Sequence, residues 1–510
     1  MSDGTPLYLP RGRPLILATM ALAAANFVVV LDTTIANVSV PHIAGSLGVS
    51  SSQAAWTITA YAVADAITVL LAGWLAMRFG AIRAFTGALM GFGAFSVLCG
   101  LSPTIEMLVI ARIGQGMCGG PLIPLSQALL MRIYPPETRA KGSAIWSSTT
   151  LLAPVLGPVF GGLISDGLSW HWIFLINIPV VIGCILSVTA LLKGVENEPV
   201  DRPIDRVGFA LMVLGIGALQ LVLDLGREHD WFGDPTVLGL AIVAAIALAA
   251  FVIWELTAEH PLVDLRVFRH YGYTIGMLCF TMGFGTYYAG VVVIPQWMQV
   301  SLGYTATQAG LATCVTGLAA IAMTTVPARL AHWMDARLII SIGILWMGGA
   351  TIMRSSWTSE VDFWQLLLPQ FLMGFAFPLC FTTLIFTSFA QVPPREMATA
   401  AGLFAFMRTT GLAFGTSLSL TFWDSEGRVA GSELAGSLHS DATSAALAAN
   451  GFSIEQSREF IAQLVHREAV TLATDKIFLA SGVATCLMVV AIWFIPPPRK
   501  PGTSAPADAH

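Results

Sequence analysis

Six ionisable side chains stand inside or at the edge of long apolar stretches, where a charge is expensive to place: Asp32, Asp65, Arg112, Asp224, Glu255 and Arg408. A charged side chain at the centre of a bilayer costs roughly 2.5–3.5 kcal/mol on insertion scales, so such residues usually face a cavity or a partner. A carboxyl group that alternates between a wet and a dry surrounding can load and release a proton. Asp32 is the first candidate for this chemistry, and the alternative is a permanent ion pair between two helices.

Arg112 is the natural counter-charge for Asp32, because a guanidinium stays charged and does not titrate. Gln115 follows Arg112 at i+3 and Gly119 follows at i+7, so the three share one face of a helix. On that face Arg112 either tunes a carboxylate or holds an anionic group, with Gln115 beside it in a cavity. The alternative is that Arg112 only donates hydrogen bonds to backbone carbonyls.

Further polar residues are candidates for a cavity lining or a second proton site. Asp65 lies in the middle of its apolar stretch and is either a second proton site, a group that attracts cations, or a wall of a wet crevice that does not titrate. Arg408 lies in MRTTGLAFG, and we place it at the cavity. Asn26, Thr33 and Asn37 share a helical face from which Asp32 points away. One of the two faces is expected to hold helices together and the other to line the cavity.

The sequence offers no motif for other chemistry. Its seven cysteines lie in apolar runs without a C-x-x-C pair, which is typical of buried free thiols. The patterns H-E-x-x-H, G-x-S-x-G and G-x-x-x-x-G-K-[ST] are absent. We therefore expect no metal, no cofactor, no nucleic-acid partner and no enzymatic activity.

Helices that cross a membrane must position the candidate residues. The 510 residues are 55% hydrophobic and only 11% charged, whereas soluble domains carry about 25% charged residues. Since a helix needs about 20 apolar residues to cross a bilayer, we expect an all-α polytopic membrane protein with about fourteen spans. The spans are predicted at 15–38, 53–75, 84–101, 105–130, 141–164, 172–192, 207–225, 236–256, 272–298, 305–327, 336–354, 363–389, 398–422 and 477–496.

The charges between these spans predict the orientation of the chain. With the N-terminus in the cytoplasm, the cytoplasmic segments hold most of the Lys and Arg residues, and the short external loops hold only Arg227 and Arg354. Cytoplasmic loops of membrane proteins carry this excess, so both termini are predicted to be cytoplasmic. The first apolar stretch exceeds signal-peptide length and is expected to stay as an anchor.

An internal repeat divides the chain into two related parts. The segment that begins at Tyr134 matches the segment that begins at Val392, and the same offset of 258 relates Gly116 to Gly374. Two six-helix halves plus two inserted helices explain this offset. We predict a cytoplasmic N-terminus at 1–14, a first half at 15–192, inserted helices at 207–256, a second half at 272–496 with a long external loop at 423–476, and a cytoplasmic tail at 497–510.

The predicted external loop contains a stretch with helical spacing of apolar residues, at Phe460, Ile461, Leu464 and Val465. This amphipathic helix either docks on a partner or caps the outer face of the protein itself.

Small residues and prolines indicate where helices pack closely and bend. Gly116 with Gly120, and Gly157 with Gly161, form G-x-x-x-G pairs that let helix backbones approach one another. Pro154 and Pro158 interrupt the hydrogen-bond ladder of the helix that carries the second pair. A bendable, closely packed helix between two halves suits a rocking motion, and plain packing is the alternative.

Several segments together resemble the drug:proton antiporters of the major facilitator superfamily, in their fourteen-helix branch. They are LDTTIANVSVPHIAG (31–45), GWLAMRFGAIRAF (73–85), ARIGQGMCGGP (111–121), APVLGPVFGG (153–162) and WHWIFLINIP (170–179). In the second of these the family usually has an Asp where this chain has Met77, while the gating residues Arg78 and Arg83 are present. The resemblance favours a functional Asn37.

This resemblance implies a major facilitator fold and proton-coupled export of hydrophobic, amphipathic toxic compounds by alternating access. It also implies a multi-pass protein of the bacterial inner membrane that works in a three-part pump, with a periplasmic adaptor and an outer-membrane channel. The alternatives are a carrier for one defined metabolite and a membrane sensor that transports nothing.

Overall fold

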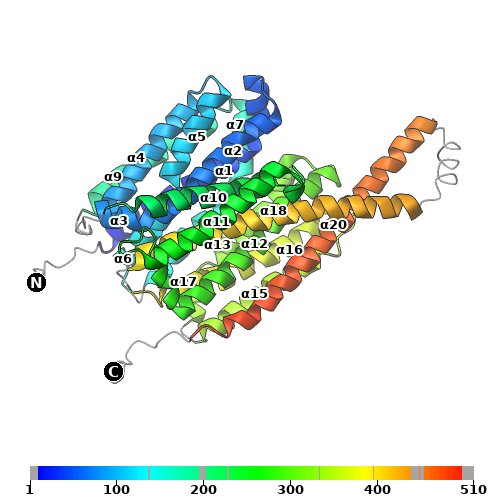
Figure 1. Cartoon of the computed structure of the whole chain (residues 1–510). Coiled ribbons are helices and arrows are strands. Elements are labelled where there is room, and N and C mark those ends of the chain that lie inside the picture. Colours follow the sequence, from blue (N-terminus) through cyan, green and yellow to red (C-terminus); the bar gives the residue numbers. More distant parts are fainter. Residues whose placement is uncertain are drawn as a thin grey trace, which may run out of the picture.

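The computed structural model describes residues 10–135, 138–193, 203–226, 229–331, 333–393, 396–437, 447 and 453–496. Within these ranges the chain is a bundle of helices without β-strands (Figure 1). The start of α1 and the end of α20 lie at one end of the bundle, which we call the terminal end (Figure 1). A hairpin made by α18 and α20 projects from the opposite end, which we call the hairpin end (Figure 1). The prediction of an all-α protein is confirmed.

The first half packs α1 against α7 and α9, and α5 against α2 and α4. Its helices are α1 (Arg13–Leu47), α2 (Ser51–Thr68), α3 (Ala72–Phe79), α4 (Ala81–Gly100), α5 (Ile105–Gly119), α6 (Leu122–Ile133), α7 (Arg139–Gly167), α8 (Trp172–Leu175) and α9 (Asn177–Leu191), with the 3-10 turn η1 (Val69–Leu71) between α2 and α3. Several predicted spans are thus built from two consecutive helical pieces.

Two inserted helices follow, and α10 packs on both α11 and α2. They are α10 (Arg206–Leu225) and α11 (Pro235–Thr257), joined through η2 (Trp231–Gly233) and followed by η3 (Leu265–Arg269). The second half contains α12 (Tyr271–Val300), α13 (Ala306–Met323), α14 (Val326–Leu330), α15 (Ala336–Arg354), α16 (Phe363–Phe377), the π-helical turn η4 (Pro378–Thr382), α17 (Thr383–Phe389), α18 (Met397–Ser437) and α20 (Ile454–Ile492).

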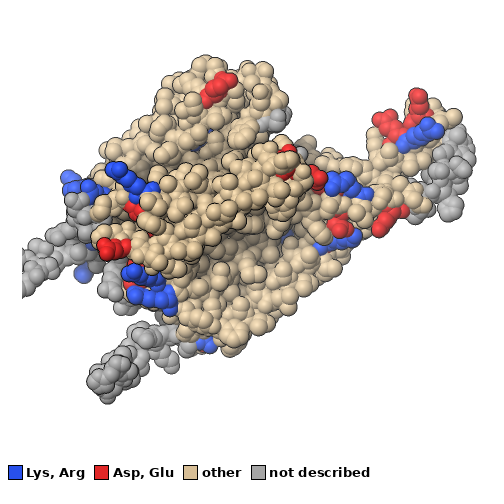
Figure 2. All heavy atoms as spheres, viewed as in Figure 1, with Lys and Arg blue, Asp and Glu red and all other residues tan. Residues whose placement is uncertain are grey.

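The apolar surface of the bundle fits a membrane. Among the described residues, twelve helical segments are long and apolar enough to cross a bilayer. Two further long helices, α7 and α18, pack in the same bundle, against α1 and α12 respectively. Charged side chains gather at the two ends of the molecule, and the band between them is nearly free of charge on the visible face (Figure 2). The count of fourteen spans and the cytoplasmic termini stay predictions.

The internal repeat is visible in the positions at which helices begin. Three pairs of helices begin 258 residues apart, at Arg13 and Tyr271, at Ile105 and Phe363, and at Arg139 and Met397. The same kinds of residue also start α2 and α13: the side chains of Ser50 and Thr305 each cap a helix in a box with a Gln three residues later. The repeat found in a short sequence match therefore extends over most of both halves.

The segment 423–476, predicted as a long external loop with an amphipathic helix, is largely helical where the structure describes it. Helix α18 continues past 422 to Ser437, and α20 begins at Ile454 and runs without interruption into the last span. Two contacts hold these extensions together: Trp423 Nε1 donates to Thr474 Oγ1 at 2.8 Å, and Lys476 pairs with Glu426 at 2.6 Å. Because each helix stabilises the other, neither unwinds where the apolar span ends.

One side of the expected amphipathic stretch faces this protein itself. Ile461 and Val465 line a groove against α18, together with Gly427 and Gly431. Phe460 and Leu464 are exposed. The stretch therefore covers part of its own hairpin, and docking on a partner stays a prediction.

The two halves meet along a seam that has contacts toward both ends. Toward the terminal end, α3 and α6 pack on α18, and a Cβ atom at Gly73 would lie 2.9 Å from Thr399 Oγ1. Toward the hairpin end, α7 packs on α13, and a Cβ atom at Gly310 would lie 3.9 Å from Val159. Between these contacts lie the cavities described below.

Candidate functional site

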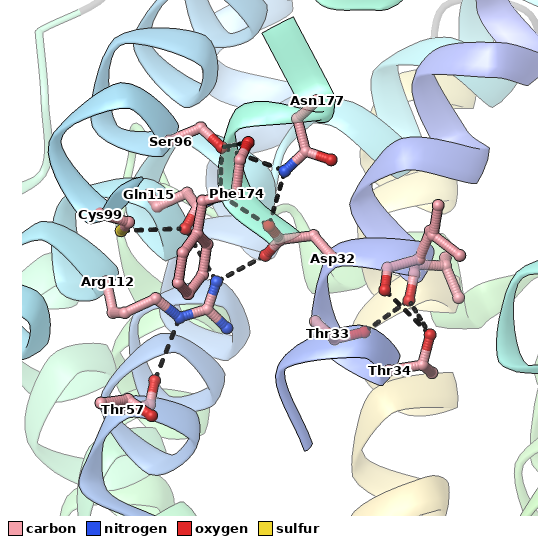
Figure 3. A network of polar contacts seen from close by, with 12 residues as sticks. Asp32, Thr33, Thr34, Thr57, Ser96, Cys99, Arg112, Gln115, Phe174 and Asn177 are labelled. Atoms are coloured by element: carbon pink, nitrogen blue, oxygen red, sulfur yellow. Dashed lines mark hydrogen bonds and ion pairs between the residues drawn. The ribbon is translucent and has the colours of Figure 1, made fainter. Parts of the chain in front are cut away.

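Asp32 and Arg112 form an ion pair in the interior of the first half (Figure 3). Arg112 Nη1, on α5, lies 2.5 Å from Asp32 Oδ2, on α1, and both side chains are almost completely buried. The predicted pairing is present. Removing one partner of a buried pair typically costs 3–5 kcal/mol, because the other charge is left uncompensated.

Two amide side chains complete the surroundings of the Asp32 carboxylate. Gln115 Nε2 donates to Asp32 Oδ1 at 3.0 Å, and Asn177 Nδ2 of α9 donates to the same oxygen at 2.7 Å. Ser96 on α4 accepts a hydrogen bond from each of these amides (Figure 3). The network thus joins α1, α4, α5 and α9.

Arg112 is held on its other side by α2. Its Nε donates to the carbonyl of Thr57 at 3.2 Å, and its guanidinium carbon lies 4.1 Å from the centre of the Tyr61 ring. The structural alternative, hydrogen bonding to a backbone carbonyl, and the ion pair with Asp32 are therefore both present at once.

Asn177 and Ser96 were not singled out from the sequence, although Asn177 lies in the quoted segment WHWIFLINIP. An uncharged polar residue inside an apolar span is a weak signal, since many such residues only bond their own helix. The available clue was that Asn177 is a polar residue at the start of an apolar helix, inside a segment that resembles the family.

The remaining polar residues of α1 lie outside this network. Thr33 and Thr34 donate to carbonyl groups of their own helix (Figure 3). The side chain of Asn26 donates to Thr149 Oγ1 at 3.0 Å and Thr150 Oγ1 at 2.8 Å on α7, which joins two helices. Asn37 is exposed, toward the end of α1, and is not brought to the same place as Asp32.

Asp65 and Arg408 come from opposite halves of the protein. Asp65 lies on α2 and Arg408 on α18, both half-buried, and the two side chains interact electrostatically across the seam. Arg408 lines a cavity with Phe284, Phe381 and Trp146, and its guanidinium carbon lies 6.0 Å from the centre of the Phe284 ring. This is the cavity position expected for Arg408.

A second cavity lies next to the first and shares three of its lining residues, Thr150, Phe284 and Phe377. It is walled by α7, α12, α13, α15 and α16, and its polar groups include Arg354 and Gln370. The two cavities together form an aromatic space between the halves. Gln115, expected to line such a space, lies in the Asp32 network instead and borders neither cavity.

The structure corrects the position of Arg354. The charge count placed it in a short external loop, but it is the last residue of α15 and is only 3% exposed. Its Nη2 donates to Gln370 Oε1 at 2.6 Å. The side chain turns inward at the helix end, and a count of charges along the chain cannot detect that direction.

Three of the four glycines expected at close helix contacts lie at such contacts, namely Gly116, Gly120 and Gly157. A Cβ atom at Gly116 would lie 2.5 Å from the carbonyl oxygen of Tyr61, and one at Gly120 would lie 2.6 Å from that of Asp65. A Cβ atom at Gly157 would collide with Thr34 of α1, and Gly161 is buried. Helices α5 and α7 can thus approach α2 and α1 only because these positions carry no side chain.

The other expected gating residues lie near the ends of helices. Arg78 is half-buried in the last turn of α3, and Arg83 is exposed near the start of α4. Pro154 and Pro158 belong to α7, and their side chains lie outside the described part of the structure.

Known proteins resemble this chain in sequence over nearly its whole length. It is 38% identical over 498 residues to the multidrug export protein EmrB of Escherichia coli K12, which covers 96% of this chain and 97% of that protein. It is 36% identical over 499 residues to the fatty acid resistance protein FarB of Neisseria gonorrhoeae, covering 96% of this chain and 98% of that protein.

The fold is also found in solved structures. The proton:xylose symporter XylE, bound to 6-bromo-6-deoxy-D-glucose, superposes with a TM-score of 0.58 at 14% sequence identity, over 95% of this chain and 96% of that one. Residues 22–416 match the sequence pattern of the Major Facilitator Superfamily. The paired halves, the membrane-spanning helices and these similarities lead to one conclusion: this chain belongs to the Major Facilitator Superfamily.

Proposed function

We propose that this protein exports hydrophobic and amphipathic toxic compounds from bacterial cells, in exchange for protons, as a component of the inner membrane. The observation that carries the proposal is the 38% identity to a multidrug export protein across 96% of the chain. The aromatic cavities at the seam support it, because sites for such compounds are mostly apolar with few polar groups.

Proton exchange requires a carboxyl group that meets water in part of the cycle. Asp65 is half-buried on α2 and interacts electrostatically with Arg408 of the other half, so a movement of the halves changes its surroundings directly. Asp32 is enclosed by Arg112, Gln115 and Asn177 in the described conformation. Protonation of Asp32 requires α1 and α5 to separate. We therefore propose that Asp32 takes up its proton after Asp65 in the transport cycle.

Passage across the whole envelope needs further proteins. We propose that the exporter works with a periplasmic adaptor of the EmrA type and an outer-membrane channel of the TolC type. The hairpin of α18 and α20 projects beyond the bundle (Figure 1), and we propose that the adaptor binds to it.

Transport by purified protein in liposomes tests the proposal. An imposed pH gradient is expected to drive ethidium transport by the wild type, and collapse of the gradient is expected to stop it. Asp65→Asn is expected to abolish substrate-induced proton release, and Asp32→Asn is expected to abolish driven transport. Asp424→Asn, a change on the hairpin, serves as the control.

The outcomes separate the alternatives. Ethidium transport at the same rate with and without the pH gradient would contradict proton coupling. Tight binding of one polar solute without ethidium transport would indicate a carrier for a metabolite. Absence of any transport by correctly folded wild type would favour a sensor.

A further inference from the structure

The second cavity contains the buried guanidinium of Arg354. Arg354 is 3% exposed and lines the cavity from the end of α15. Its Nη2 donates to the neutral Gln370 amide, its Nε has no hydrogen-bond partner, and the centre of the Phe478 ring lies 5.8 Å from its guanidinium carbon. Within the described residues no carboxylate forms an ion pair with it. Buried charges are normally paired. The Arg354 guanidinium therefore departs from the usual arrangement, because its counter-charge is missing among the described residues.

The partner of Arg354 is itself fixed in place. Thr316 Oγ1 on α13 donates to the Gln370 carbonyl at 3.0 Å and to Gln370 Oε1 at 3.2 Å. The amide oxygen therefore faces Arg354 as an acceptor and holds one edge of the guanidinium. An arginine has five N–H donors, and those not used here are available to a group in the cavity.

The internal repeat shows which position of the second half corresponds to the carboxylate of the first half. The offset of 258 that relates α1 to α12 and α5 to α16 places Gly290 at the position of Asp32, and Gln370 at the position of Arg112. A Cβ atom at Gly290 would lie 3.0 Å from Arg354 Nη1. The second half thus has a glycine where the first half has its carboxylate, and the guanidinium beside that glycine belongs to Arg354.

We propose that Arg354 is the binding site for the anionic group, a carboxylate, of an amphipathic compound whose apolar part lies against Phe284, Tyr287 and Phe377. The proposal rests on the export function proposed above and names a class of substrate for it. A planar guanidinium binds a carboxylate through two parallel hydrogen bonds. The cavity is narrow, with about 590 Å³ of empty space when its open mouth is counted, and aromatic side chains line it beside the charge.

A matched pair of ligands tests the site. Binding of 1-naphthaleneacetate and its neutral analogue 1-naphthaleneacetamide to the purified full-length protein would be measured by equilibrium dialysis. Hydrogen bonds to a charged group favour the anion by about tenfold or more. Arg354→Gln is expected to remove this preference, and Arg354→Lys to keep part of it. Arg458→Gln, which changes an exposed arginine of the hairpin, is expected to leave it intact.

A second pair of variants decides the question even if Arg354→Gln does not fold. Gly290→Asp supplies a carboxylate beside Arg354 and is expected to abolish the preference for the anion by occupying the guanidinium. Gly290→Asn adds nearly the same volume without the charge and is expected to keep at least part of the preference. Equal effects of the two variants, or equal loss of both ligands with Arg354→Gln, would overturn the proposal.

The failure of this site and the failure of export are distinguishable. Ethidium transport by the same variants reports on export without using an anionic ligand. Normal ethidium transport by a wild type that does not prefer the anion contradicts only the site at Arg354. Anion preference in a protein that transports nothing supports the site and contradicts export.

Discussion

At the scale of single residues, the two halves place their scarce charges differently. The first half contains a complete ion pair, Asp32 with Arg112, surrounded by amide donors. The second half contains Arg354, which donates to an amide oxygen, borders a cavity and has no ion pair with a carboxylate among the described residues. A satisfied pair stabilises one arrangement of helices, whereas an unpaired guanidinium attracts a mobile anion. The geometry shows that the first pair joins helices of its half; its role in coupling and the role of Arg354 in binding remain the proposals made above.

A paired substitution separates these two roles of Asp32. Asp32→Leu alone leaves Arg112 buried without a counter-charge and is expected to destabilise the fold by about 3–5 kcal/mol. Adding Arg112→Met removes the stranded charge and is expected to restore most of that stability. The thermal midpoint, followed by size-exclusion chromatography after heating, measures both effects.

The paired variant is nevertheless expected to show no transport driven by a pH gradient. If the apolar pair transports ethidium as fast as the wild type, the ion pair has only a structural role.

At the scale of helices, close contact depends on a few positions without side chains. Gly116 and Gly120 bring α5 against backbone atoms of α2, which carries both Tyr61 and Asp65. The backbone cannot yield as the end of a flexible side chain can. The same contact sets the distance between Arg112 and the carbonyl of Thr57, so helix packing and the ion-pair network depend on one another.

Enlarging one of these glycines is expected to disturb both. Gly116→Val would insert an isopropyl group whose Cβ atom alone would lie 2.5 Å from the Tyr61 carbonyl oxygen, and overpacking typically costs about 1–3 kcal/mol or more. Gly183→Val is the matched control, because Gly183 is exposed in α9 and a Cβ atom added there would meet no other atom within 4 Å. Denaturation curves in detergent compare the two.

A Gly116→Val protein as stable as Gly183→Val would show that α2 and α5 do not need this contact. Stability lost in both variants to the same extent would attribute the effect to the helix and not to the contact between α2 and α5.

At the scale of the whole molecule, the halves touch toward both ends and enclose aromatic cavities between them. Opening toward either side of a membrane must break one set of contacts, either α3 and α6 with α18, or α7 with α13. Rocking of two repeated halves about a central site is how many secondary transporters work.

A reversible cross-link tests whether the contact toward the hairpin end must open. Val159 and Gly310 lie on opposite halves, and a Cβ atom at Gly310 would lie 3.9 Å from Val159. With the seven native cysteines replaced, Val159→Cys combined with Gly310→Cys is expected to form a disulfide under oxidation. Transport is expected to stop on oxidation and to return on reduction.

The single-cysteine variants are the controls and should not respond to oxidation. Full transport by the oxidised double variant, with the cross-link verified by electrophoresis, would contradict separation of the halves at this contact.

The sequence by itself determined the features that depend on local pattern. Apolar runs of the right length predicted helices such as α10, α11 and α15, whose observed bounds agree within a residue or two. The short repeat predicted two related halves, and the scarcity of charge in apolar runs identified Asp32, Asp65, Arg112 and Arg408. These results follow because hydropathy and helix caps act over a few neighbouring residues.

Only the tertiary structure decided which of these residues meet. Arg112 reaches Asp32 across 80 residues of sequence, and Asn177 reaches it across 145. The inward turn of Arg354 and the continuation of α18 and α20 into a hairpin were likewise decided by packing against distant helices. A side chain's direction around its helix, and the partner it finds there, depend on how helices pack together, and no local pattern contains that information.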